Sequence, residues 1–212
     1  MTDKERSPDG LLDCGADGPS HAHRNDGRRW TGLLAHRWPT ALGVAVAALT
    51  AYGMDRADEI VLLSPLVVLM ALVYVGSAAV DRRWFAWVVL LFAGLPLLTF
   101  VPSTSGIEPA VILLIAAAIF LAVGAAHGLL RKPGGLPLQT AGMLGFGAGM
   151  LAALYAAPEL GAYLVAIGLL GHGAWDIVHY VGNRVVARSY AEFCAVLDLL
   201  VGATVLVVLF VG

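Results

Sequence analysis

Long runs of apolar residues, separated by short charged connectors, dominate the chain and restrict the folds open to it. Only 13% of the residues are charged, which is about half the share found in soluble domains. A helix needs roughly 20 mostly apolar residues to cross the hydrocarbon core of a bilayer. The sequence therefore predicts an all-α polytopic bundle of seven transmembrane helices within a domain covering residues 37–212. The predicted spans are residues 38–54, 60–80, 84–101, 110–130, 140–157, 160–181 and 191–211.

Lysine and arginine fall almost entirely on one side of this predicted bundle. With seven spans the connectors alternate sides, so twelve of the thirteen basic residues share the side of the N-terminus and only Arg56 lies on the other. Basic residues near the ends of spans are retained in the cytoplasm. We therefore expect a cytoplasmic N-terminus and a C-terminus outside. The abundance of Ala, Val, Leu and Gly, with Arg outnumbering Lys, is typical of a GC-rich bacterial genome, so the expected location is a bacterial inner membrane.

Residues 1–36 differ sharply in composition from the rest of the chain. They are rich in Asp, Arg, Gly, Pro and Ser and poor in aliphatic residues, so they bury too little apolar surface to offset the entropy lost on ordering. We expect a disordered cytoplasmic tail. The formal net charge of the whole chain is −2, and no basic face exists outside the tail and connectors. This argues against a nucleic-acid partner and leaves membrane lipids as the expected partners.

Pairs of glycines at four-residue spacing predict close helix packing. Gly124 and Gly128 lie in the fourth predicted span, and Gly145 and Gly149 lie in the fifth. Small residues at this spacing let two helix backbones approach closely in a membrane. We interpret both pairs as packing surfaces of the bundle.

The sixth span contains the run GHGAWDIVHY, in which three ionisable residues share one face. His172, Asp176 and His179 stand at i, i+4 and i+7, so they fall within an arc of about 60° on a helix that turns ~100° per residue. Ionisable groups inside a membrane helix are costly and normally face the bundle interior, a partner group or a water-filled cavity. This stripe is therefore the main candidate for a functional site.

Two further ionisable residues lie at matching depths in other spans. Asp198 is level with Asp176 on the seventh span, and His127 is level with His179 near the cytoplasmic end of the fourth. If the fourth, sixth and seventh spans are neighbours, all of these groups converge in the cytoplasmic half of the bundle. The sequence supplies their depth but does not show which helices are neighbours.

Three hypotheses fit this set of residues. In the first, a divalent metal such as zinc or iron binds His172, Asp176, His179 and His127, and Asp176 and Asp198 serve in catalysis. Imidazole and carboxylate are suitable ligands for such a metal, and the protein would be a metal-dependent membrane enzyme acting on a lipid or apolar substrate at the cytoplasmic side. In the second, the groups relay protons or bind a cation in a small coupled transporter. In the third, they form a structural hydrogen-bonded network.

The runs HGAWDIVHY and YAEFCAVLDLL resemble a motif of small uncharacterised membrane proteins of actinobacteria, over about the last 45 residues, and that likeness implies no particular activity. Seven helices with the N-terminus inside are also similar in architecture to the metal-dependent membrane hydrolases that include alkaline ceramidases and the progestin and adiponectin receptors. That family holds zinc with three histidines near an aspartate and a serine. Ser77 and Asp81 end the second span here, but the last span lacks the family's paired histidines at i and i+4.

Overall fold

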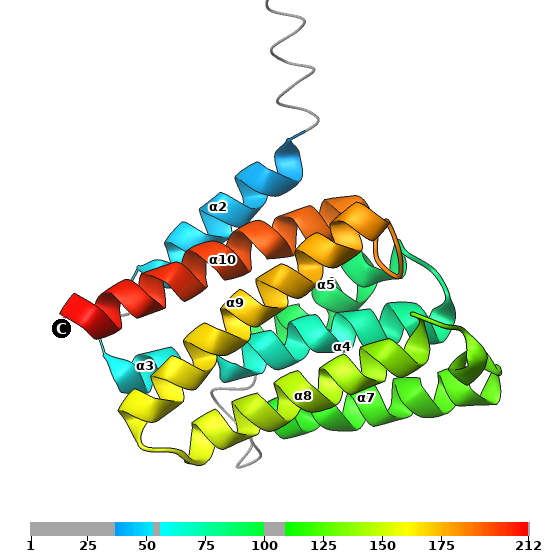
Figure 1. Cartoon of the computed structure of the whole chain (residues 1–212), viewed down its shortest axis with the longest axis horizontal. Helices are drawn as coiled ribbons and strands as arrows, with labels where there is room; N and C mark the ends of the chain where they lie inside the picture. Colours follow the sequence, from blue (N-terminus) through cyan, green and yellow to red (C-terminus); the bar gives the residue numbers. More distant parts are fainter. Residues whose placement is uncertain (1–36, 53–55, 100–108, 212) are drawn as a thin grey trace, which may run out of the picture. The chain divides into compact units, whose positions relative to one another are not determined.

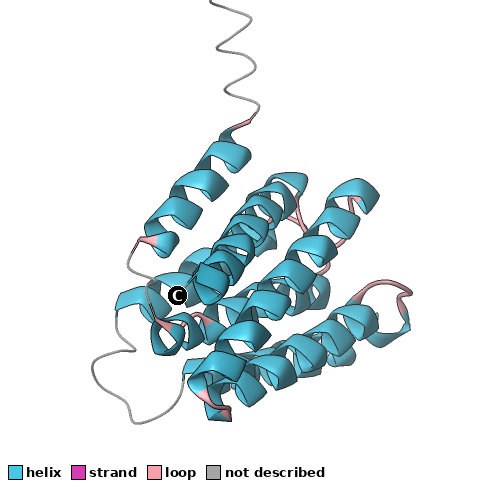
Figure 2. Ribbon diagram, turned by 60° about the vertical axis from the view of Figure 1, so that its left-hand side comes forward, coloured by secondary structure: helices cyan, strands magenta, loops and turns pink. Residues whose placement is uncertain are grey.

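The computed structural model describes residues 37–52, 56–99 and 109–211, and within these ranges the side chains of residues 58 and 97–99 are not described. The predicted tail, residues 1–36, lies outside these ranges. All regular structure in the described part is helical (Figure 2). The elements are α2 (Trp38–Ala51), α3 (Ala57–Val61), α4 (Ser64–Val80), α5 (Phe85–Thr99), α7 (Pro109–Ala126), the 3-10 helix η1 (Leu129–Arg131), α8 (Leu136–Tyr155), α9 (Pro158–Gly182) and α10 (Arg188–Val211).

Five helical stretches in the described part are long and apolar enough to cross a membrane: Glu59–Val80, Pro109–Ala126, Leu136–Tyr155, Pro158–Gly182 and Arg188–Val211. The first and third predicted spans form the shorter apolar helices Trp38–Ala51 and Phe85–Pro96. The 14 residues of α2 cover about 21 Å at 1.5 Å per residue, which is less than the ~30 Å hydrocarbon core. The all-α membrane class is supported, whereas the count of seven spans stays a prediction.

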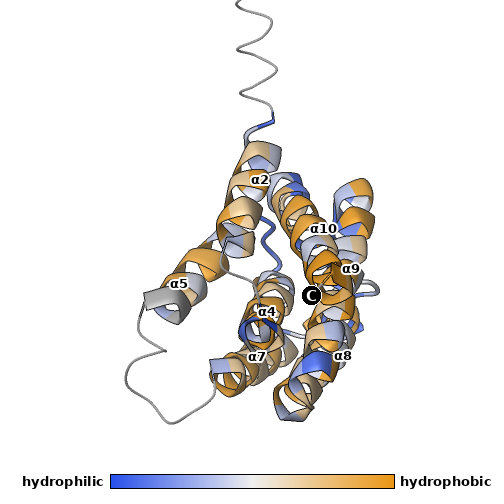
Figure 3. Cartoon of the chain, turned by 90° about the vertical axis from the view of Figure 1, so that its left-hand side faces the viewer, coloured by the Kyte–Doolittle hydropathy of each residue, from blue (hydrophilic) through white to orange (hydrophobic). Residues whose placement is uncertain are grey.

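Helix α4 lies at the centre of the bundle and packs against α5, α7, α8 and α9 (Figure 1). Of the 17 residues of α4, 15 are buried, including every residue from Val67 to Ala79. A helix that is apolar on all sides needs neighbours or lipid on all sides, and here protein supplies most of them. Hydrophobic residues also run along most of the surrounding helices (Figure 3), and many of their large side chains are exposed, among them Leu91, Ile119 and Val178.

Helix ends follow from local residue chemistry. Proline occupies the first turn of α4, α8 and α9, where its missing N–H removes no helical hydrogen bond. Asp81 and Asn183 terminate α4 and α9 in the left-handed region, with φ of 54° and 47°. Asn and Asp tolerate that conformation better than most residues. These two ends carry the connectors that hold Arg82 and Arg184.

The glycines that pack closely are only partly those expected from four-residue spacing. Gly124 packs against Ala79 of α4, but Gly128 lies beyond α7 in a turn with φ of 73°. A Cβ added at Gly145 or Gly149 would meet nothing within 4 Å. The interpretation of Gly145 and Gly149 as a packing surface within this chain is therefore wrong, because that face of α8 points away from its neighbours.

We predict that Gly161→Ala destabilises the bundle by about 1–3 kcal/mol, the usual cost of overpacking. A Cβ at Gly161 would lie 2.6 Å from the Ala153 carbonyl oxygen and 2.8 Å from Val61, and a backbone atom cannot move aside cheaply. The matched control is Gly145→Ala, which adds the same methyl group to open space and should leave stability unchanged or raised. Thermal unfolding in detergent, followed by circular dichroism, measures both. Equal unfolding temperatures for the two variants would contradict the predicted packing.

Candidate functional site

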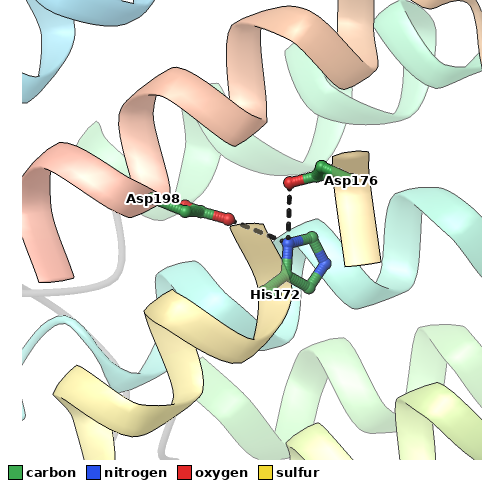
Figure 4. A group of neighbouring side chains, drawn as sticks. All are labelled: His172, Asp176 and Asp198. Carbon is green, nitrogen blue, oxygen red and sulfur yellow. Dashed lines mark hydrogen bonds and ion pairs between the residues drawn. The ribbon is translucent and has the colours of Figure 1, made fainter. Parts of the chain in front are cut away.

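A buried group of three ionisable side chains lies where α9 and α10 pack side by side. His172 Nδ1 is 2.8 Å from Asp198 Oδ2 and 3.2 Å from Asp176 Oδ2, and all three side chains have no exposed surface. Figure 4 shows the imidazole of His172 directed at both carboxylates. We call His172, Asp176 and Asp198 the buried triad.

Small residues make this approach of α9 to α10 possible. A Cβ at Gly173 would lie 3.0 Å from Leu199 and 3.5 Å from Asp198 Cβ, and one at Gly202 would lie 3.0 Å from Leu170. Larger residues at these positions would separate the two helices. Glycine next to His172 therefore places Asp198 within hydrogen-bonding distance of the imidazole.

Helix α4 also contributes to the site, through Tyr74. Tyr74, which is buried in the middle of α4, donates its hydroxyl hydrogen to Asp176 Oδ1 at 2.5 Å. The Tyr74 ring also lies edge-on to the rings of His172 and His179, with centroid separations of 5.7 and 4.8 Å. The tyrosine fixes the orientation of the Asp176 carboxylate and closes this side of the triad.

His179 belongs to a separate set of hydrogen bonds. Its Nδ1 lies 2.9 Å from the Trp175 carbonyl oxygen, which can only accept, so Nδ1 carries a hydrogen. Its Nε2 lies 3.0 Å from Gln139 Nε2 and accepts from that amide when the ring is neutral. Gln139 in turn accepts from the Trp175 indole N–H at 3.3 Å. Both nitrogens of His179 are therefore engaged, and neither is free to bind a metal.

The structure brings together part of the predicted site. Asp198, which lies at the same depth as Asp176, joins His172 and Asp176, and a ligand atom from each lies within 4.8 Å of the others. His179 is buried nearby but is bonded to Gln139 and Trp175 instead. His127 is exposed in the turn that follows α7, so it does not lie in the triad. Of the four predicted metal ligands, His172 and Asp176 lie together, and His179 and His127 do not join them. Asp198, predicted as a catalytic residue, is the third member of the group.

Two atoms of the triad have no hydrogen-bond partner among the described residues. They are His172 Nε2 and Asp198 Oδ1, and both are buried. A narrow pocket reaches His172 between α4, α8 and α9, with Tyr74, Phe146 and Trp175 among its walls. The Phe146 ring covers the imidazole at a centroid separation of 5.0 Å. The imidazole of His172 is therefore enclosed by aromatic side chains.

The charges of the triad decide what it can bind. Two carboxylates face one imidazole, and no described Lys or Arg pairs with either. Two unit charges 4 Å apart interact by about 4 kcal/mol even at an effective dielectric of ~20, and two buried anions also lose their hydration. Hydrogen bonds from Tyr74 and His172 offset only part of this cost. The arrangement needs positive charge, supplied either by protons on the triad itself or by a metal ion.

The fold and site together define an all-α membrane protein with a buried His/Asp/Asp group. No protein-family model, curated protein or solved structure matches the chain.

Sequence reasoning missed Tyr74 and Gln139. Tyrosine counts as apolar in a span and the notable polar residues were the ionisable ones, so neither residue stood out. A usable signal was present for Gln139, because it is an amide among apolar residues at the start of a span. For Tyr74 no signal distinguishes it from a packing residue until α4 is known to be central.

We predict that Tyr74→Phe destabilises the protein by about 1–3 kcal/mol, because it leaves Asp176 Oδ1 buried without its donor. Tyr190→Phe is the matched control: Tyr190 is as fully buried as Tyr74, but its hydroxyl has no oxygen or nitrogen partner among the described residues and meets only the Cys194 thiol, a weak hydrogen-bonding group. Denaturant or thermal unfolding of the two variants gives the comparison. A loss for Tyr190→Phe that equals or exceeds the loss for Tyr74→Phe would contradict a stabilising role for the Asp176 contact.

Proposed function

We propose that the chain spans the membrane seven times, with the N-terminus inside and the C-terminus outside. The connector after α4, the connector before α8 and the connector after α9 line one common cavity, which is the arrangement that alternating spans require. At the other end, Val61 of α3 and Ala153 near the end of α8 both approach Gly161 at the start of α9. The basic residues of the three connectors that line this cavity then mark the cytoplasmic side.

Within this topology, we propose that the protein is a small proton- or cation-coupled transporter and that the buried triad is its cation-binding centre. The observation that carries this proposal is that the carboxylates of Asp176 and Asp198 both contact His172 Nδ1. None of these three side chains has exposed surface. Buried His and Asp groups at membrane depth are typical of proton relays in pumps and transporters. Tyr74 extends the hydrogen-bonded chain from Asp176 into α4.

Enclosure of the triad favours transport over hydrolysis of a lipid at the same place. Aromatic rings of Tyr74 and Phe146 cover His172, and the narrow pocket that touches His172 has no room for a substrate. A proton or a single ion needs no such room. The ligand set expected for a metal enzyme is also incomplete, because His127 is exposed and His179 is committed to Gln139.

A metal-dependent membrane enzyme is the second candidate, because three ligand atoms of the triad converge within 4.8 Å. One imidazole and two carboxylates suit zinc, iron or manganese, and the Tyr74 bond to Asp176 is the kind of outer contact that orients a metal ligand. Against it, His172 Nε2 has no hydrogen-bond partner in the part of the chain that the structure describes, whereas the free nitrogen of a metal-bound histidine nearly always donates to one.

We expect Asp198→Asn to change the pH-dependent protonation signal that the wild-type protein shows in the carboxyl region of its infrared difference spectrum. The reason is that a proton on the triad must reside on Asp198, Asp176 or His172. Glu159→Gln, on the exposed first turn of α9, removes a carboxylate elsewhere and serves as the control. A spectrum unchanged by both Asp198→Asn and Asp176→Asn would exclude the triad as a proton site.

Elemental analysis separates the two candidates. The proton hypothesis predicts that detergent-purified protein contains no stoichiometric metal, and that reconstituted wild-type protein shows ion- or pH-dependent flux that His172→Ala abolishes. About one zinc, iron or manganese per chain, lost in His172→Ala, would instead identify the metal-dependent enzyme. If there is neither metal nor flux, and His172→Ala only lowers the unfolding temperature, the triad is structural.

A further inference from the structure

A cavity of about 590 Å³ opens at the end of the bundle where α4 and α9 end and α8 begins. Its walls come from the last turn of α4, the connector before α8 and the connector after α9. None of the triad residues lines it, so it is a second candidate site with its own chemistry. We call it the end cavity.

Positive charge is in excess in the end cavity. Arg83, Lys132 and Arg184 line it, and Asp81 is the one acidic residue among the described lining residues. Lys132 is already paired with Asp81. Neither guanidinium has a carboxylate partner among the residues that the structure describes, so the cavity presents two uncompensated arginines to a ligand.

Ser77 gives the end cavity a buried polar contact. Its side chain has no exposed surface, and its Oγ has no hydrogen-bond partner within the described part of the chain. Ser77 also lines the cavity, so a buried polar group without a partner lies at the cavity wall. Buried hydroxyls without a partner are uncommon in folded proteins, and this one points to a polar ligand.

The backbone around the end cavity holds the two arginines in fixed relation. The amide N–H of Ala187 donates to the Arg83 carbonyl at 3.1 Å, which ties the two connectors together. Val185 has φ of 66°, and the N–H of Val186 donates to the Arg184 carbonyl at 2.7 Å, so Val185 is the centre of a strained γ-turn. A β-branched residue in this conformation is a genuine outlier, and strain of this kind persists where surrounding contacts impose it.

From these observations we propose that the end cavity binds a phosphate-bearing anion. Arg83 and Arg184 pair with its oxygens, and Ser77 Oγ donates a hydrogen bond to it. Guanidinium groups match the geometry of phosphate and form paired hydrogen bonds with it. Retention of basic residues in the cytoplasm explains why the connectors are basic, but it requires neither a cavity between them nor a buried hydroxyl in its wall.

Two sources can supply this chemistry: the headgroup of an anionic phospholipid, or a free phosphorylated small molecule. Trp84 follows Arg83 and is 62% exposed, and tryptophan is enriched at the level of lipid headgroups. The cavity then lies at a depth that both a headgroup and a soluble anion can reach. The site does not depend on the transport proposal, because it shares no residue with the triad.

The test compares the full-length protein with two double variants of equal charge. Arg83→Gln with Arg184→Gln removes the two arginines of the cavity. Arg82→Gln with Arg131→Gln removes two neighbouring arginines that do not line it. One assay measures enrichment of phosphatidylglycerol over phosphatidylcholine around protein in mixed nanodiscs, by native mass spectrometry. The other measures binding of inorganic phosphate in phosphatidylcholine nanodiscs, by equilibrium dialysis.

We expect the cavity variant to weaken binding by about tenfold or more, since a hydrogen bond to a charged group is worth at least about that factor, and the control variant to bind as wild type. Lipid enrichment without phosphate binding identifies the headgroup, and phosphate binding without lipid enrichment identifies a soluble anion. If the cavity variant fails to fold, Ser77→Ala replaces it and should weaken the same binding. Absence of both signals in the wild type, or an equal loss in both double variants, overturns the proposal.

Discussion

The hydrogen bonds of His172 Nδ1 to two aspartates are the interaction on which the site depends. They hold α9 against α10 at the depth where Gly173 allows a close approach. Such a group is stable in a low-dielectric interior only when its charge is balanced and its polar atoms are bonded. The central helix α4 serves that requirement through Tyr74, which bonds Asp176 and shields the imidazole. The most buried helix and the most polar cluster are therefore parts of one arrangement.

Much of the fold could be predicted because hydrophobic length is a strong signal in membrane chains. Each of the seven apolar segments contains a helix, and the predicted bounds of the sixth, 160–181, differ from α9 by two residues at most. Span count is harder to fix, because α2 and α5 are short and the chain next to each, residues 53–55 and 100–108, lies outside the described part. Neither length nor composition then decides whether these two helices cross the whole bilayer.

The site was predicted as far as depth along a helix determines it. Asp176 and Asp198 were expected at one level, and both bond to His172. Depth does not determine which helices are neighbours or which face a residue takes. His127 has suitable depth but follows the end of α7 and is exposed. His179 has suitable depth and face, but Gln139 and Trp175 are closer partners than the triad. The contact of Tyr74 with Asp176 could not be predicted, because it depends on the central position of α4.

The triad and the end cavity are separated by one turn of helix and by Gln139. Ser77 lines the cavity three residues beyond Tyr74 on α4, and residues three apart lie on the same helix face. Gln139 bonds His179 at 3.0 Å and reaches the Gly134 carbonyl of the cavity wall at 3.4 Å. An anion held by Arg83 and Arg184 would stand on one side of Gln139 and His179, with the carboxylates of the triad on the other side. The anion and the carboxylates carry charge of the same sign, so occupation of the end cavity would favour the form of the triad that holds a proton or a cation.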